Sequence, residues 1–112
     1  MSILNRTVEV LPRTTLLVGQ LDYSAPGCYR NVEVIPFKVR PNRRIRVDVE
    51  SDSPVDVAVA NDDGSTNAFR QSQTEAVLGP FPTGKNDSMA LVLGLYPGDR
   101  ANVTVRVTMS RD

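Results

Sequence analysis

Strict alternation of apolar and polar residues marks three stretches of the chain. In "VDVAVA" (55–60), Val55, Val57 and Val59 point to one side, and the residues between them point to the other. The stretches 44–50 and 102–109 alternate in the same way. A period of two over this length is typical of strands with one buried face. These segments are therefore predicted to be strands that share one core.

The stretch "SMALVLGLY" (88–96) differs because it is apolar on both faces. Such a pattern favours a central strand with the core on one side and a loop or a partner on the other. Weaker strand candidates are 3–10, 14–21, 31–39 and 67–78. In 31–39 the parity of the apolar residues changes at Pro36, and proline cannot donate to a sheet ladder. A bulge or an edge strand is therefore expected there.

Turn residues separate these stretches. The predicted turns are "RPNR" (40–43), "SDSP" (51–54), "NDDGS" (61–65), "PTGKND" (82–87) and "YPGDR" (96–100). No segment of useful length has a helical period, and short strands recur at roughly ten-residue spacing. The predicted fold class is all-β, an antiparallel β-sandwich of about eight strands with a jelly-roll-like arrangement. A chain of 112 residues predicts one domain, 1–112, in which 1–12 is an N-terminal arm or an edge strand.

Composition argues against several functions. The chain has no histidine, which removes Ser-His-Asp and Cys-His catalysis and ordinary zinc sites, and an enzyme is not expected. The single cysteine, Cys28, cannot form an internal disulfide. Thirteen basic residues balance thirteen acidic ones, so no nucleic-acid partner is expected. No stretch resembles a signal peptide or a membrane-spanning helix, so membrane insertion is not expected either, and the localisation stays open.

An acidic stretch, residues 45–64, supplies hard oxygen ligands of the kind that calcium prefers. Some of its carboxylates lie on strand faces, where a polar residue simply faces water. Asp52, Asp62 and Asp63 lie in predicted loops and are the candidate calcium ligands; calcium is the only cofactor considered. The alternative is a solvent-facing strand with a hairpin turn, because Asn and Asp stabilise such turns locally.

A basic cluster surrounds the turn at 40–43 and consists of Arg40, Arg43, Arg44 and Arg46. Four guanidinium groups there could hold a phosphate, a sulfated sugar or a carboxylate-rich partner. The alternative is that they pair with Asp48 and Glu50 on the same strand face.

Three aromatic residues are candidate interface anchors. Tyr23 and Tyr29 flank a Pro-Gly turn, and Phe81 stands between two prolines that stiffen its loop. The alternatives are tyrosines that cover an edge of the sheet and a Phe81 that closes an open end of the core.

The segments 16–63 ("LLVGQ…VANDD") and 89–109 ("MALVLGLYPGDRANVTVRVTM") resemble two families of β-sandwich modules. One is the GOLD type of p24-like proteins, and the other is the prepeptidase C-terminal type of bacterial and archaeal surface modules. A p24-like cargo receptor would also need a transmembrane tail or a coiled coil, which is not expected for this chain. The resemblance implies a non-catalytic module for protein–protein or carbohydrate contact, and it carries no site residues over to this chain.

The functional hypothesis is therefore a non-catalytic interaction module whose partner is another protein or a second copy. Two alternatives stay open. One is a self-assembling or decorating structural subunit of a particle, capsid or surface layer, and the other is a small calcium-binding domain.

Overall fold

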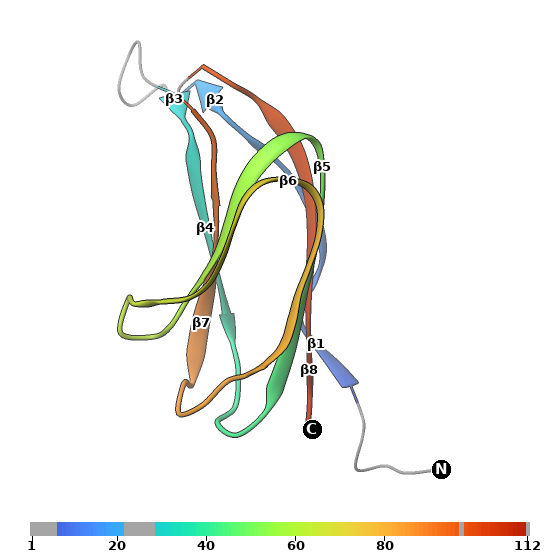
Figure 1. The fold of residues 1–112 in the computed structure, drawn as a ribbon, viewed down its shortest axis with the longest axis vertical. Coiled ribbons are helices and arrows are strands. Elements are labelled where there is room, and N and C mark those ends of the chain that lie inside the picture. Colours follow the sequence, from blue (N-terminus) through green and yellow to red (C-terminus); the bar gives the residue numbers. More distant parts are fainter. Residues whose placement is uncertain (1–6, 22–28, 97, 112) are drawn as a thin grey trace.

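The computed structural model describes residues 7–21, 29–96 and 98–111. Its largest feature is a hairpin of two 17-residue strands, β5 (Arg44–Ala60) and β6 (Thr66–Pro82). The hairpin bends in its middle into an arch (Figure 1). The bend coincides with breaks in the β5–β6 register between Glu50 and Val57, where Pro54 lies on β5 and Ser72 on β6 has a positive φ of 55°. Such irregularities bend a strand sharply.

Four further strands complete the main antiparallel sheet: β1 (Thr7–Val18), β4 (Val32–Lys38), β7 (Ser88–Gly94) and β8 (Ala101–Ser110). β8 pairs with the first half of β5 and β7 with the second half, both on the side of β5 away from β6. β1 then pairs with β8, and β4 with β7. The short strands β2 (Gln20–Leu21) and β3 (Tyr29–Arg30) form a separate ladder.

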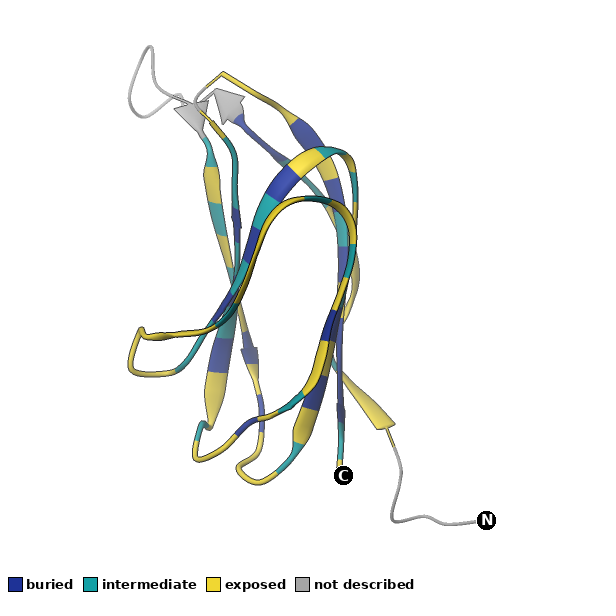
Figure 2. Cartoon of the chain, viewed as in Figure 1, coloured by how far each residue is buried: buried dark blue, intermediate teal, exposed yellow. Residues whose placement is uncertain are grey.

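Because the arch bends the sheet over, the half with β4 and β7 faces the half with β1 and β8 (Figure 1). The core lies between the two halves and is built mainly from valine and leucine. The alternation predicted from the sequence is confirmed, because Val55, Val57 and Val59 are all buried while the residues between them are partly open. Figure 2 shows the resulting bands of buried and exposed residues along β5.

Two local expectations are refined by the structure. β4 is an edge strand whose pairing with β7 runs without a register shift through Pro36, so the proline marks an edge and not a bulge.

The alternation predicted for 102–109 places Thr108 on the side that faces water, but this residue is only 8% exposed. It stands in register between Arg46 and Glu9, and long charged side chains on neighbouring strands cover the shorter threonine.

The prediction of an all-β antiparallel fold is confirmed. The main sheet is one continuous sheet of six strands, so the finer prediction of a jelly-roll-like sandwich with about eight strands stays a prediction. Residues 7–12 of the expected arm or edge strand lie in β1, at one end of the strand order. In the described ranges, no helix has the length and apolar character needed to cross a membrane.

Candidate binding surfaces

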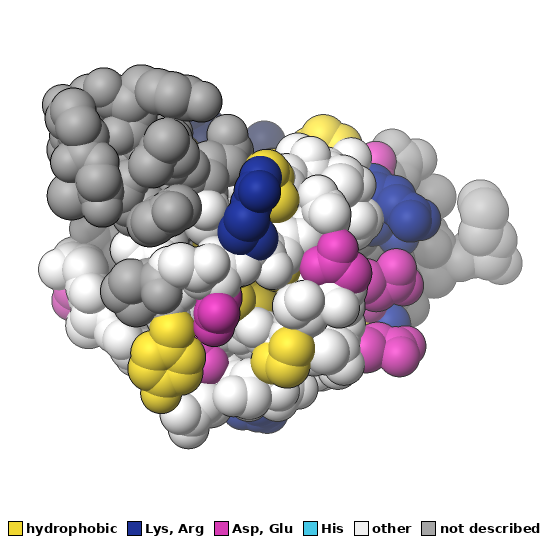
Figure 3. Space-filling model, turned by 90° about the horizontal axis from the view of Figure 1, so that it is seen from above, with side chains coloured by type: hydrophobic (Ala, Val, Ile, Leu, Met, Phe, Trp, Pro, Cys, Tyr) yellow, Lys and Arg dark blue, Asp and Glu magenta, His cyan; other side chains and the backbone are white. Residues whose placement is uncertain are grey.

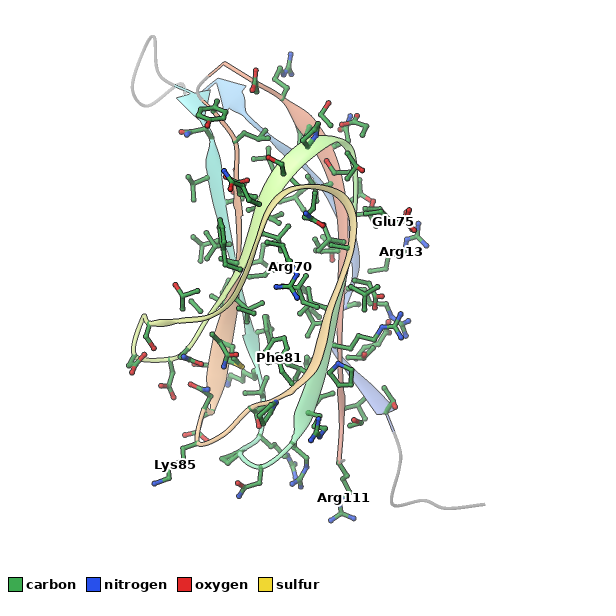
Figure 4. All side chains as sticks on the ribbon, in the orientation of Figure 1. Arg13, Arg70, Glu75, Phe81, Lys85 and Arg111 are labelled. Carbon is green, nitrogen blue, oxygen red and sulfur yellow. The ribbon has the colours of Figure 1, made fainter. Side chains whose placement is uncertain are left out.

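The outer side of the half with β1 and β8 is a charged face. It holds a depression of about 550 Å³ whose walls carry both signs of charge. The charged residues of its lining are Arg13, Arg46, Asp48, Glu50 and Arg106. Viewed onto the arch, charged side chains gather on the side where β1 and β8 lie (Figure 3). Figure 4 places Arg13 and Glu75 on that same side, outside the arch.

Several charges on this face are already paired. The guanidinium of Arg46 donates to Oδ1 of Asp48 from Nε at 3.1 Å and from Nη2 at 3.0 Å. Nε of Arg106 donates to Oε2 of Glu9 at 2.6 Å. Exposed pairs of this kind contribute little to stability and are typical of a solvated sheet face. The depression therefore offers mixed, partly neutralised charge and no concentrated field.

The predicted basic cluster does not form one group of converging guanidiniums. Arg44 and Arg46 lie on the charged face, because they alternate with buried Ile45. Nη1 of Arg43 instead turns back to its own loop, 3.4 Å from the carbonyl oxygens of Pro41 and Asn42. Arg40 is exposed beside this turn. The pairing of Arg46 with Asp48 agrees with the alternative stated above, and anion binding stays a prediction.

Asp52 lies apart from the other two candidate calcium ligands, Asp62 and Asp63, which are neighbours in one turn. The predicted turn at 51–54 is wrong, because these residues form the bend inside the continuous strand β5, so Asp52 does not lie in a loop. Asp52 accepts hydrogen bonds from the backbone N and Nδ2 of Asn102, each at 2.9 Å. The side-chain bond from Asn102 is the larger reason that the pKa of Asp52 lies below its usual value.

Asp62 and Asp63 lie in the turn between β5 and β6. Asp63 accepts from Oγ and N of Ser65, and the side-chain bond is the larger cause of its lowered pKa. Within the described residues no three His, Cys, Asp or Glu side chains form a group that could hold a metal ion. Calcium binding therefore stays a prediction, and no cluster of ligands among the described residues supports it.

The expected interface anchors divide into two groups. Tyr23 lies outside the described residues. Tyr29 belongs to β3, but its side chain lies outside the described part of the chain. Phe81 is half-buried and packs against the core, and Figure 4 shows it and Arg70 within the outline of the arch. Its contact with the core agrees with the alternative of a side chain that closes an open end.

The outer side of the other half is an apolar face. One row crosses four strands on this side, and each member is the register partner of the next: Val34, Val92, Ala58 and Phe69. These residues alternate along their strands with residues that contact the core, so they point away from it. Val34 is 59% exposed and Phe69 51% exposed.

The neighbouring rows on the apolar face are also poor in charge. They consist of Val32, Gly94 and Asp56 on one side of the central row and of Pro36, Ala90 and Ala60 on the other. An exposed apolar patch that spans several strands is typical of an interaction surface. It is the counterpart of the charged face on the opposite half.

Sequence reasoning did not identify the apolar face, although signals for it were present. One signal is the second apolar side of 88–96. Another is the change of parity in 31–39, which leaves Val32 and Val34 on the outer side. A third signal is that two outer positions of 55–60 are alanines, whereas the outer positions of 44–50 are charged. Only the strand order brings these positions together with Phe69.

No family model matches the chain, and no curated protein is similar to it in sequence. Solved structures with a similar fold include the following two. One is the pre-peptidase C-terminal domain of a collagenase from Bacillus anthracis, with 14% identity, 86% of this chain and 89% of that chain covered, and a TM-score of 0.57. The other is PliG from Aeromonas hydrophila, a periplasmic inhibitor of g-type lysozyme, with 5% identity, coverage of 97% and 90%, and a TM-score of 0.58.

At such identities the likeness concerns the fold alone. It agrees with the resemblance to the prepeptidase C-terminal type, while the resemblance to the GOLD type stays an expectation from the sequence. The two similar structures are a domain of a larger protein and an inhibitor.

Proposed function

We propose that this chain is a non-catalytic interaction domain that binds a protein through its apolar face. The observation that carries the proposal is the row from Val34 to Phe69, which is exposed at both ends, partly exposed between them and crosses four paired strands without a charged residue. When a partner covers this row, each Å² of apolar area that is removed from water contributes about 25 cal/mol of favourable free energy. This free energy would drive the binding of a partner.

A protein fits this face better than a carbohydrate does. The hydroxyl groups of a sugar need hydrogen-bond donors and acceptors, and the central row offers only aliphatic and aromatic side chains. A partner with valine, leucine or aromatic residues would replace water at Val34 and Phe69 without leaving polar groups unpaired.

Composition, the side chains of the described residues and the similar folds are compatible with a role without catalysis. The chain has no histidine. The described residues hold no cluster of metal-ligating side chains, and two of the three arginines in the depression already pair with carboxylates. The similar folds, one of them an inhibitor of an enzyme, are compatible with a domain that acts by contact.

Site-specific photo-crosslinking tests the proposal. A photoreactive phenylalanine analogue would replace Val34, and a control chain would carry the same analogue at Val77, which is 51% exposed on the charged face. Irradiation in the cells that make the protein should give a protein adduct at position 34 and little at position 77. Equal labelling of both positions, or no protein adduct at position 34, would contradict a binding role for the apolar face.

A further inference from the structure

We propose that the apolar face binds the same face of a second copy of this chain, in a dimer whose two-fold axis runs along β7. This inference rests on the proposed function and names the partner. It comes from a difference between the two strands that flank β7. In two of the three rows β4 presents a large side chain on the outer side and β5 presents an alanine; in the third row Val32 of β4 shares Gly94 with Asp56 of β5.

Two rows show this difference in size. Val34 shares a row with Ala58, and Pro36 shares the next row with Ala60, each across one residue of β7. A two-fold rotation about β7 places β4 of one copy over β5 of the other. Val34 and Pro36 then each stand opposite an alanine, while Val32 stands opposite Asp56 in the end row of the contact. Large side chains opposite small ones allow two sheet faces to interdigitate at the density of a protein interior.

Two opposite charges, one on each side of β7, lie beside the same end of this strand, so the two-fold rotation would bring them together. Lys38 on β4 is the register partner of Ser88, the first residue of β7. On the β5 side, Oδ2 of Asp62 accepts a hydrogen bond of 3.4 Å from the backbone N of Asp87, the residue directly before β7. Asp62 therefore lies beside the same end of β7. The rotation about β7 brings Lys38 toward Asp62 of the second copy, twice in the dimer. Opposite charges in these places favour this arrangement over other registers.

The assembly stops at two copies because one outer face of the sheet is apolar and the other is charged. Only one outer face of the described sheet is apolar, since the other carries the charged depression. A two-fold contact buries the apolar face of both copies at once and leaves none to recruit a third. The formal net charge of zero means that no overall repulsion opposes the contact.

The size of the face sets the strength of the dimer. The rotation about β7 superposes only β4, β7 and β5 of the two copies, because β6 lies beyond β4 of the other copy. Three strands about 4.8 Å apart and three rows about 6.8 Å apart give a sheet area of about 300 Å² per copy. A stable interface of standard size buries about 800 Å² per partner. The dimer is therefore weak and exchanges with the monomer, and its fraction depends on protein concentration.

Sedimentation velocity on the purified full chain over a concentration series, up to about 1 mM, tests the inference. The wild type should shift from monomer to dimer as the concentration rises. Val34→Lys should raise the dissociation constant at least tenfold, while Val77→Lys, which places the same charge on an exposed valine of the other face, should leave it unchanged. Circular dichroism melts confirm that both variants fold. A wild type that stays monomeric, or equal effects of the two variants, would overturn the inference.

A charge exchange tests the position of the axis. Lys38→Asp alone should weaken the dimer several-fold, because two carboxylates then meet at each of the two symmetric contacts. The double variant Lys38→Asp with Asp62→Lys should recover most of the loss, because it restores opposite charges across the interface. A double variant that is as weak as the sum of its single changes would overturn the axis along β7.

The crosslinking experiment separates the failure of this inference from the failure of the proposed function. An adduct at position 34 with a different protein, together with a monomeric wild type, would overturn the second copy as partner and keep the interaction role. An adduct of twice the mass of the chain supports both. No protein adduct at position 34 and no dimer would overturn both.

Discussion

Asp52 joins the bend of β5 to the start of β8 through Asn102. Its two carboxylate oxygens accept one bond from the backbone N of Asn102 and one from Nδ2, each 2.9 Å long. These bonds favour the charged carboxylate and hold the pKa of Asp52 below its usual value. A residue that resembled a metal ligand in the sequence therefore has a structural role at the arch.

The bond between Asp52 and Asn102 predicts a pH dependence of stability. Because the pKa of Asp52 is lower in the folded chain than in the unfolded chain, its contribution is complete above the usual value of 3.8. The contribution is lost as the pH falls through the lowered pKa of the folded state. Asp52→Asn and Asn102→Ala should each flatten this part of the curve of urea midpoint against pH, measured from about pH 2 to pH 6. Curves parallel to that of the wild type would contradict this role.

The hydroxyl of Thr83 connects two residues of the turn at 40–43. The side chain is fully buried, and its Oγ1 accepts from the backbone N of Arg43 at 2.9 Å and donates to the carbonyl oxygen of Arg40 at 2.7 Å. Thr83→Val keeps the shape but leaves both backbone groups without this partner, so the free energy of unfolding should fall by about 1–3 kcal/mol. Thr83→Ser keeps the hydroxyl and should lose much less. Equal losses in urea unfolding would show that the bonds are not responsible.

Two glycines with positive φ should respond differently to alanine. At Gly79, with a φ of 92°, an added Cβ would lie 2.5 Å from the backbone oxygen of Ile45, whereas at Gly84, with a φ of 60°, it would meet nothing within 4 Å. Gly84→Ala should therefore cost only the backbone strain, about 1 kcal/mol. Gly79→Ala should cost clearly more, because β5 and β6 must also move apart. Similar urea midpoints for the two variants would contradict the close approach of the strands.

Calcium should have little effect on the thermal midpoint. Asp52 is engaged with Asn102 at the bend, and Asp63 is engaged with Ser65 in a turn. A ligand of the folded state raises stability by RT ln(1 + [L]/Kd), so a real site would move the midpoint by several degrees in millimolar calcium. Melts with calcium and with a chelator should therefore coincide. A calcium-dependent rise that Asp62→Asn abolishes would restore the metal hypothesis.

The sequence by itself determined that the alternating stretches are strands and, apart from Thr108, which of their sides is buried. It did not show that 44–50 and 55–60 join into the single strand β5. The alternation around Val47, Val57 and Val105 was sufficient because side chains of a strand point to opposite faces in turn, whatever lies beside the strand. It also determined that Pro36 belongs at an irregular place or an edge, since proline lacks the N–H that a second ladder needs.

Only the tertiary structure decided which outer positions become neighbours. Val34, Val92, Ala58 and Phe69 come from four strands whose order in the sheet differs from their order in the chain. The arch adds a second effect, because it divides β5 into a half with charged outer residues and a half with alanines. Local patterning describes one strand at a time. Strand order and the bend depend on contacts between distant segments, and these contacts create one apolar and one charged face.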